Sequence, residues 1–267
     1  MKHLIDLSAL DQLPQSGNTI LLDVRAYDAY LEGHIPGAIH ADPACFNISK
    51  PPVIGLLPDL DTFNATVSAL GIQPGHAVVV YDDTASPGAA RVVWTLLAFG
   101  HESVALLNGG LRAWIESNRT TTSNLSGIQP GSYSGALQTK RIADTNTIRQ
   151  QLHNDAACIV DARSKAEFDG ADVRTRHGGH IPGAVNLNWE DLRSESNPAM
   201  LQSDTALQDR LLAAGITPDK EIICYCQSHR RSALMCIVLE HLGYPSVKGY
   251  PGSWSEWGNR DDLPIER

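Results

Sequence analysis

Residues 222–232 read Ile-Ile-Cys-Tyr-Cys-Gln-Ser-His-Arg-Arg-Ser, so an apolar, β-prone run leads into a short polar loop. A helical pattern of apolar residues follows from Ala233 to Leu239. Cys226 therefore stands at the end of a predicted strand, facing the N-terminus of a predicted helix. The unpaired backbone N–H groups and the dipole at that position favour a thiolate. The stretch predicts a nucleophilic cysteine, with Arg231 close enough to bind an anionic substrate.

Length, charge and cysteine content restrict the class of protein. The 267 residues suffice for two domains, and the formal net charge of −9 argues against nucleic acid as a partner. Asp6 interrupts the apolar stretch that a secretory signal would need, and no apolar run approaches the roughly 20 residues of a membrane span. Five cysteines, an odd and sparse number, argue against a disulfide framework. We therefore expect a cytoplasmic protein that does not bind membranes.

The chain repeats itself. Leu-Asp-Val-Arg at 22–25 returns as Val-Asp-Ala-Arg at 160–163, and Gly-His-Ile-Pro-Gly-Ala at 33–38 returns unchanged at 179–184. The offsets, 161 − 23 = 138 and 179 − 33 = 146, are similar and the blocks keep their order. Two copies of one domain explain this pattern better than chance does.

The two copies differ at the nucleophile. Tyr81 matches Tyr225 at an offset of 144, which places Asp82 opposite Cys226. The first copy therefore lacks the cysteine, and we expect it to be catalytically silent. We predict a silent domain over residues 1–117, a linker rich in Thr, Ser, Asn and Gly over 118–137, and a catalytic domain over 138–267.

Each copy alternates strand and helix signals. In the first copy, 19–24 and 76–81 read as strands, the second without polar alternation and hence buried on both faces. Residues 61–70 read as a helix that begins at Asp61 and ends before Gly71. Short apolar strands that alternate with helices predict an α/β fold, a mostly parallel sheet with helices on both faces.

The paired blocks, the cysteine loop and the tail Gly-Ser-Trp-Ser-Glu-Trp at 252–257 together resemble the tandem-domain rhodanese family of sulfurtransferases. The resemblance covers nearly the whole chain and implies two rhodanese-like domains. It also implies a reaction: Cys226 attacks thiosulfate, sulfite leaves, and the persulfide passes its outer sulfur to cyanide or a thiol, in ping-pong order. The implied partners are a small anionic sulfur donor and a thiophilic acceptor.

Several residues are expected to bind the donor. A helix terminus and one or two N–H contacts supply about the 2.7 kcal/mol that lowers a cysteine pKa by two units, so we expect Arg231 to be free for the donor oxyanion. Arg176 lies where the related 3-mercaptopyruvate sulfurtransferases carry their second substrate arginine, so the resemblance implies a substrate contact there. Trp189, downstream of the second Gly-His-Ile-Pro-Gly-Ala block, either walls the pocket or packs in the core. The remaining candidates lie in the loop itself, with Arg230 directed either to the pocket or to solvent: Gln227, Ser228, His229 and Arg230.

The donor and the biological role have alternatives. The 3-mercaptopyruvate sulfurtransferases are the alternative, but their loop is rich in glycine and they tend to carry arginine at the position of Glu167. The loop of this chain is more cationic, which suits dianionic thiosulfate, so we favour thiosulfate as the donor. A persulfide carrier that delivers sulfur to a protein acceptor would need the same Cys226. Phosphatase chemistry is disfavoured because Arg231 comes one position earlier than in Cys-x5-Arg loops. No motif for an organic cofactor appears, and Cys-x-Cys is a poor spacing for zinc.

Residues common to both copies are better explained by structure than by catalysis. We expect an ion pair at the strand end within each Asp-x-Arg block, a turn stabilised by each histidine of the repeated hexapeptide, and packing roles for the matched tryptophans. The residues concerned are Asp23, Arg25, His34, Trp114, Asp161, Arg163, His180 and Trp254.

Overall fold

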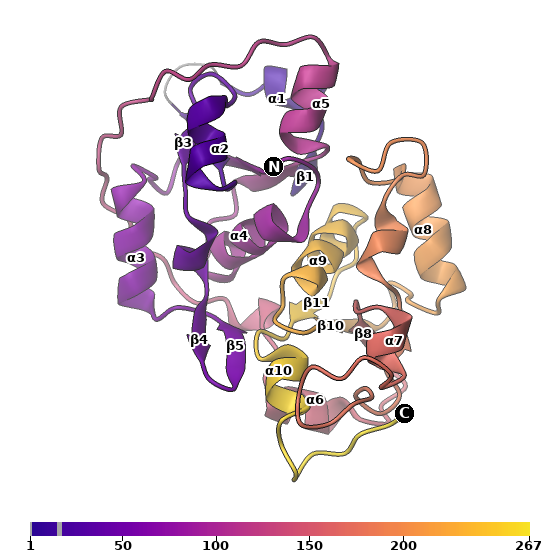
Figure 1. Cartoon of the computed structure of the whole chain (residues 1–267). Helices are drawn as coiled ribbons and strands as arrows, with labels where there is room; N and C mark the ends of the chain where they lie inside the picture. Colours follow the sequence, from indigo (N-terminus) through magenta and orange to yellow (C-terminus); the bar gives the residue numbers. More distant parts are fainter. Residues whose placement is uncertain (1, 15–17) are drawn as a thin grey trace. The chain divides into compact units, whose positions relative to one another are not determined.

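The computed structural model describes residues 2–14 and 18–267, which form two compact α/β units (Figure 1). The first unit comprises residues 1–47, 58–138 and 194–201, and the second comprises 48–57, 139–193 and 202–267. The units thus exchange two short segments, so that residues 48–57 from the first half of the sequence group with the second unit.

The first unit contains a parallel sheet in the order β1-β7-β6-β2-β3. Its helices cover both faces, as the alternating sequence signals predict. Its elements are β1 (Leu4–Ile5), α1 (Leu7–Asp11), β2 (Thr19–Asp23), α2 (Tyr27–Glu32), β3 (Ile39–His40), η1 (Pro43–Phe46), α3 (Leu60–Ala69), β6 (Ala77–Tyr81), α4 (Pro87–Ala98), β7 (Val104–Leu107) and α5 (Gly110–Glu116).

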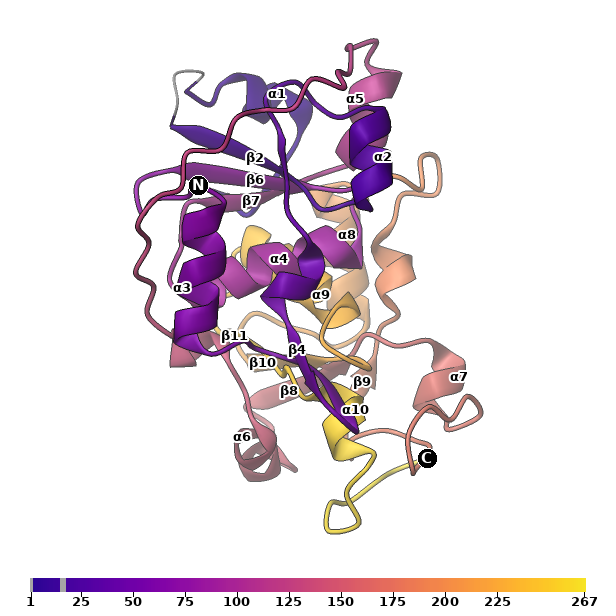
Figure 2. The same ribbon diagram turned by 60° about the vertical axis from the view of Figure 1, so that its left-hand side comes forward.

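Strand alternation divides the apolar residues of β6 between two faces. Val79 and Tyr81 pack with Leu10 of α1 and Leu111 of α5, whereas helix α4 contacts β6 and β7 (Figure 2). Helix α3 begins at Leu60, one residue before the predicted start at Asp61, because Asp59 is the N-cap and its carboxylate accepts the Thr62 N–H at 2.8 Å.

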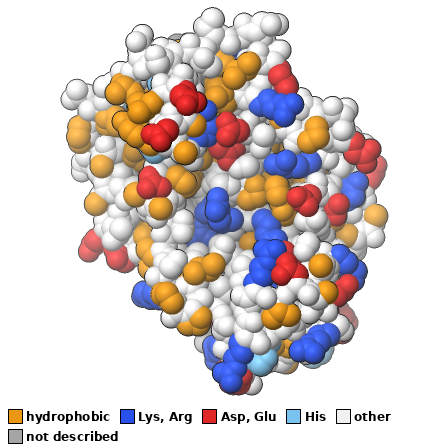
Figure 3. Space-filling model, in the orientation of Figure 1, with side chains coloured by type: hydrophobic (Ala, Val, Ile, Leu, Met, Phe, Trp, Pro, Cys, Tyr) orange, Lys and Arg blue, Asp and Glu red, His pale blue; other side chains and the backbone are white. Residues whose placement is uncertain are grey.

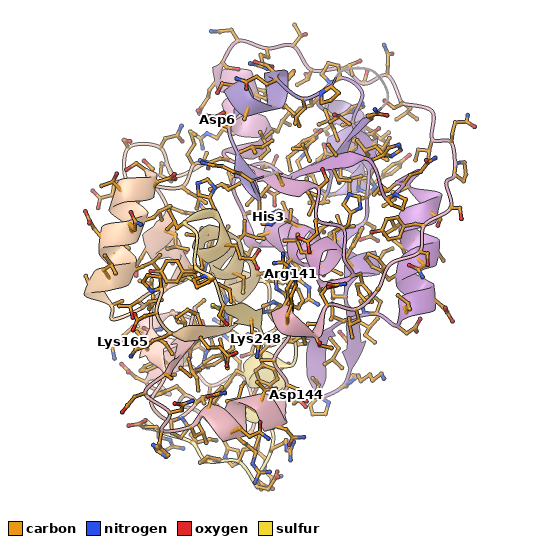
Figure 4. All side chains as sticks on the ribbon, turned by 180° about the vertical axis from the view of Figure 1, so that it is seen from behind. His3, Asp6, Arg141, Asp144, Lys165 and Lys248 are labelled. Carbon is orange, nitrogen blue, oxygen red and sulfur yellow. The ribbon has the colours of Figure 1, made fainter. Side chains whose placement is uncertain are left out.

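The second unit repeats this plan with a parallel sheet in the order β11-β10-β8-β9. In Figure 4, which views the molecule from behind, Asp144 lies at the start of α6 and Lys248 lies on β11. The elements are β4 (Ile48–Lys50), β5 (Val53–Leu56), η2 (Thr139–Arg141), α6 (Thr145–Gln151), β8 (Ala157–Asp161), α7 (Lys165–Phe168), β9 (Val185–Asn186), η3 (Trp189–Leu192), α8 (Asp204–Ala213), β10 (Glu221–Tyr225), α9 (Arg231–His241), β11 (Val247–Gly249) and α10 (Ser253–Trp257).

The central strand β10 is buried on both faces. Ile223 and Tyr225 pack with Ile148 of α6 and with Trp254 and Trp257 of α10. The alternate positions, including Cys224, are fully buried, and helix α9 contacts β10 and β11. Because β10 is packed on both faces, its carboxyl end at Tyr225 is held in place, and with it the position of the next residue, Cys226.

The ion pair predicted in each Asp-x-Arg block is confirmed. Arg25 Nη2 lies 2.7 Å from Asp23 Oδ2, and Arg163 Nη2 lies 2.6 Å from Asp161 Oδ2. Both arginines also donate to the carbonyl oxygen that opens the repeated hexapeptide, Gly33 or Gly179, at 2.7 Å. The buried pair therefore ties the end of a strand to the following turn in each unit.

The histidines of the repeated hexapeptide are structural, as predicted. The His34 ring stacks on Tyr30 with centroids 3.9 Å apart, and the His180 ring stacks on Phe168 at 3.6 Å. Trp254 is 1% exposed within the core of the second unit, whereas Trp114 is half-buried beside the core of the first.

Strands β4 and β5 form an antiparallel hairpin that was not predicted from the sequence.

The segment 118–138 runs along the first unit, where the backbone N–H groups of Gly131 and Gln138 donate hydrogen bonds to the carbonyl oxygens of Ser68 and Ala98. No helix in the described part of the chain is long and apolar enough to cross a membrane. On the face drawn in Figure 3, basic side chains are interspersed with acidic ones.

Candidate active site

Residues 226–231, named here the Cys226 loop, connect β10 to helix α9. The start of α10 holds the loop by its carbonyl groups: Trp254 N–H donates to Cys226 O at 2.9 Å, and Ser255 N–H donates to Gln227 O at 3.0 Å. His229 has φ of +55°, a left-handed conformation that closes the loop before α9 begins. With these carbonyls directed to α10, loop amides remain available to the thiol.

Cys226 is 1% exposed, and its surroundings are polar. Burial raises the pKa of the Cys226 thiol, but the Arg231 guanidinium, the Ser232 hydroxyl and the backbone amides of Ser232 and Ser228 more than offset this effect. The pKa of Cys226 therefore lies below its ordinary value. This environment stabilises a thiolate, the nucleophilic form of cysteine.

Arg231 does not stand free beside the thiol. Its Nη1 and Nη2 atoms donate to Oε2 and Oε1 of Glu167 at 2.5 and 2.9 Å. Here the structure corrects the sequence-based expectation, because the guanidinium is held by a carboxylate and is itself the largest influence that lowers the Cys226 pKa. Loop amides alone do not account for the thiolate.

Glu167 is anchored by its own helix. It is the N3 residue of α7 and forms a capping box with Ser164, whose hydroxyl accepts the Glu167 N–H at 3.3 Å. The carboxylate is also 3.5 Å from Arg174 Nη1. Burial raises the pKa of Glu167, yet its hydrogen bonds and ion pair with Arg231 lower that pKa to about 2.

The other loop residues differ in position. His229 is fully buried and its Nδ1 lies 2.7 Å from Ser232 Oγ, while Gln227 and Ser228 are half-buried. Arg230 is exposed, which is the solvent-facing alternative left open by the sequence. Of the loop side chains, the structure therefore turns only Arg231 toward the thiol as a cation.

Two predicted substrate residues outside the loop have other contacts. Arg176 is 63% exposed and pairs with Asp261 at 2.8 Å. Trp189 is half-buried, with the Arg193 guanidinium carbon 4.6 Å from its ring centroid. Arg174, which sequence reasoning missed, is the arginine outside the loop that reaches the Glu167–Arg231 pair. The segment between the Asp-x-Arg block and the hexapeptide is longer in the second copy than in the first. This longer segment, which contains Arg174, was the sequence signal that could have pointed to it.

The first unit carries a carboxylate at the matching position. Asp82 follows β6 as Cys226 follows β10, and its Oδ2 accepts hydrogen bonds from the Ser86 hydroxyl and from Ala89 N–H at 3.2 Å. Burial raises the pKa of Asp82 to about 6 despite these bonds. The anion-stabilising end of helix α4 is thus filled by a side chain of the chain itself.

Comparison with known proteins identifies related sequences and folds. The model of the rhodanese-like domain matches residues 6–117 and 144–260. A thiosulfate sulfurtransferase of Azotobacter vinelandii is 40% identical over 98% of this chain and 94% of its own length. The sulfur carrier protein TtuD of Thermus thermophilus is 32% identical over 92% of this chain and 88% of its own.

A solved structure of a related protein spans both units. The 3-mercaptopyruvate sulfurtransferase SseA of Escherichia coli aligns with a TM-score of 0.82 and 28% identity, over 96% of this chain and all of that one. The predicted arrangement of two rhodanese-like domains is therefore confirmed.

Replacing Arg231 with alanine is expected to raise the pKa of Cys226, because the substitution removes the cation that most favours the thiolate. The measurement is the rate of iodoacetamide alkylation at Cys226 against pH, read by peptide mass. Arg230→Ala is the matched control, since it removes an exposed arginine one residue away. Equal midpoints in the two variants would contradict the role given to Arg231.

Replacing Glu167 with glutamine is expected to destabilise the fold by about 3 kcal/mol near neutral pH, from a pKa lowered from 4.5 to about 2. Because the folded-state pKa is depressed, this contribution is fully present above about pH 4.5 and is lost as pH falls toward 2. Urea unfolding of both proteins between pH 3.5 and 7 measures the difference. A difference that does not shrink below pH 4.5 would refute the assignment.

Proposed function

Because the chain belongs to the rhodanese-like family, we propose that it is a sulfurtransferase that carries sulfur as a persulfide on Cys226. The observation that carries the proposal is the buried Cys226 thiol with a lowered pKa, beside the Arg231 guanidinium. A sulfur nucleophile of this kind accepts a sulfane sulfur and releases it again. A serine alkoxide is a harder nucleophile and scarcely forms near neutral pH, so it would not suit this exchange of a soft sulfur.

The reaction proceeds in two displacements. The Cys226 thiolate attacks the outer sulfur of thiosulfate, the sulfur–sulfur bond breaks, and sulfite leaves with the bonding electron pair. The cysteine then bears a persulfide anion. Cyanide or a thiolate attacks the outer sulfur of that persulfide, and the Cys226 thiolate is regenerated as leaving group. Charge and electrons balance without an oxidant or a cofactor.

The same loop serves both covalent states. The Ser228 and Ser232 amides, the Ser232 hydroxyl and Arg231 stabilise the anion on Cys226 before the first displacement. The persulfide extends the anion by one sulfur and keeps its charge, so these donors stabilise the intermediate too. Because Glu167 fixes the guanidinium, little reorganisation is needed between the two steps.

Thiosulfate is the proposed donor. The Arg231 guanidinium beside Cys226 favours an anionic donor, and the Azotobacter relative is named a thiosulfate sulfurtransferase. The relationship to SseA makes 3-mercaptopyruvate the competing donor, and the relationship to TtuD makes delivery of the persulfide sulfur to a protein acceptor the second candidate function.

Further parts of the proposal concern the rest of the chain. Asp82 in place of cysteine supports a catalytically silent first unit, joined to the second through residues 118–137. Gln227, Ser228 and His229 shape the donor site as parts of the loop. The five cysteines are all free, which suits a reducing cytoplasm, and the acidic net charge is unsuited to nucleic acid.

Incubation with thiosulfate is expected to add the mass of one sulfur atom to the intact protein, and cyanide is expected to remove it. Cys226→Ala should show no gain, whereas Cys224→Ala, which removes a buried thiol two residues earlier, should behave as wild type. Sulfur loading of Cys226→Ala would refute the proposal.

Steady-state rates with thiosulfate and with 3-mercaptopyruvate test the choice of donor. We expect a higher kcat/KM for thiosulfate, and a higher kcat/KM for 3-mercaptopyruvate would reverse the assignment.

A further inference from the structure

The hairpin of β4 and β5 belongs to the second unit although it lies in the first half of the sequence. Its strands pair with each other and with no other strand of the described residues. Because a two-stranded hairpin is marginally stable by itself, it depends on what it packs against. The hairpin packs against the Cys226 loop, through Gly55 and Ser228.

Gly55 of β5 lies against the backbone of Ser228. A Cβ atom at Gly55 would lie 2.2 Å from the Ser228 carbonyl oxygen and 2.8 Å from its carbonyl carbon, far inside van der Waals contact. Gly55 also has φ of +82°, a conformation that L side chains rarely adopt. Only glycine allows this approach of hairpin to loop.

Ser228 is the loop residue on which this contact bears most directly. Its backbone N–H is among the donors to the Cys226 sulfur, while its carbonyl group faces Gly55. A displacement of Ser228 would therefore move a donor away from the reacting sulfur. The hairpin limits that displacement through its contact with the Ser228 carbonyl group.

A second link joins the hairpin to the loop through Ser255, which is 1% exposed. Its hydroxyl oxygen accepts the Ile54 N–H at 3.1 Å and lies 3.0 Å from Ile54 O. The backbone N–H of the same residue donates to Gln227 O at 3.0 Å. Ile54 and Gln227 are thus held by one residue of α10.

We propose that the β4–β5 hairpin is a built-in brace of the active-site loop, with Gly55 as a positioning residue that sets the place of Ser228 relative to Cys226. The catalytically silent half of the sequence thereby contributes to the reacting centre through a segment of ten residues, 48–57. The inference rests on the proposed role of Cys226.

The test compares two glycine-to-alanine variants that share backbone strain and differ in space. Gly55→Ala places a methyl group against Ser228. Gly243→Ala is the control: it lies in the same unit with φ of +85° and has nothing within 4 Å of the added Cβ. Both should lower the melting temperature. Because a shift of about 1 Å at a reacting centre can reduce rates about 100-fold, only Gly55→Ala should lose kcat by 10-fold to 100-fold.

The pH profile of Cys226 alkylation separates positioning from simple loss of stability. Gly55→Ala should raise the midpoint of that profile, and Gly243→Ala should leave it unchanged. Equal kcat values and equal midpoints in the two variants would overturn the proposal. Should Gly55→Ala fail to fold, Ser255→Ala decides: a wild-type midpoint and kcat in that variant also overturn it.

The outcome is distinguishable from a failure of the proposed function. Persulfide formation in wild type and its absence in Cys226→Ala establish the chemistry independently of the hairpin. If Cys226→Ala still transfers sulfur, the proposed function fails. If Cys226 is required but Gly55→Ala matches Gly243→Ala, only the role of the hairpin fails.

Discussion

A charged sulfur inside a protein must obtain from its neighbours what water would otherwise supply. Cys226 is 1% exposed, so burial alone would keep its thiol protonated. Backbone amides, the Ser232 hydroxyl and the Arg231 guanidinium reverse that preference. The strand, the loop and the two helices α9 and α10 matter for function because they place these donors around one atom.

The cation in this arrangement carries its own counterion. The Arg231 side chain is 18% exposed, so leaving its charge without an acceptor whenever Cys226 is protonated would destabilise the fold. Glu167 prevents this, because its two carboxylate oxygens accept hydrogen bonds from the guanidinium. Glu167 is in turn fixed by the capping box of α7 and by Arg174. Charges of opposite sign therefore alternate from the Cys226 thiolate through Arg231 and Glu167 to Arg174. The carboxylate of Glu167 holds Arg231 in place.

The duplication shows how one frame supports two outcomes. In both units a buried Asp-x-Arg pair ties a strand end to the repeated turn, and a tyrosine hydroxyl accepts an amide hydrogen from that turn. At the next position the second unit has Cys226, whereas the first has Asp82. The carboxylate of Asp82 accepts hydrogen bonds from Ser86 and Ala89 at the start of α4, so the same backbone arrangement holds a carboxylate in the first unit and a thiol in the second.

The repeat, the parallel α/β plan, the strand-end ion pairs and the place of Cys226 between a strand and a helix can all be predicted from the amino-acid sequence, because each depends on residues close together in the chain or on a repeated pattern. Tertiary structure decided what surrounds the nucleophile. Glu167 meets Arg231 across 64 positions, and Gly55 meets Ser228 across many more, at distances that no local pattern encodes. Arg176, which the family resemblance implies as a substrate residue, pairs with Asp261, and its role toward a substrate stays a prediction. Long-range packing, not local preference, brings those groups together.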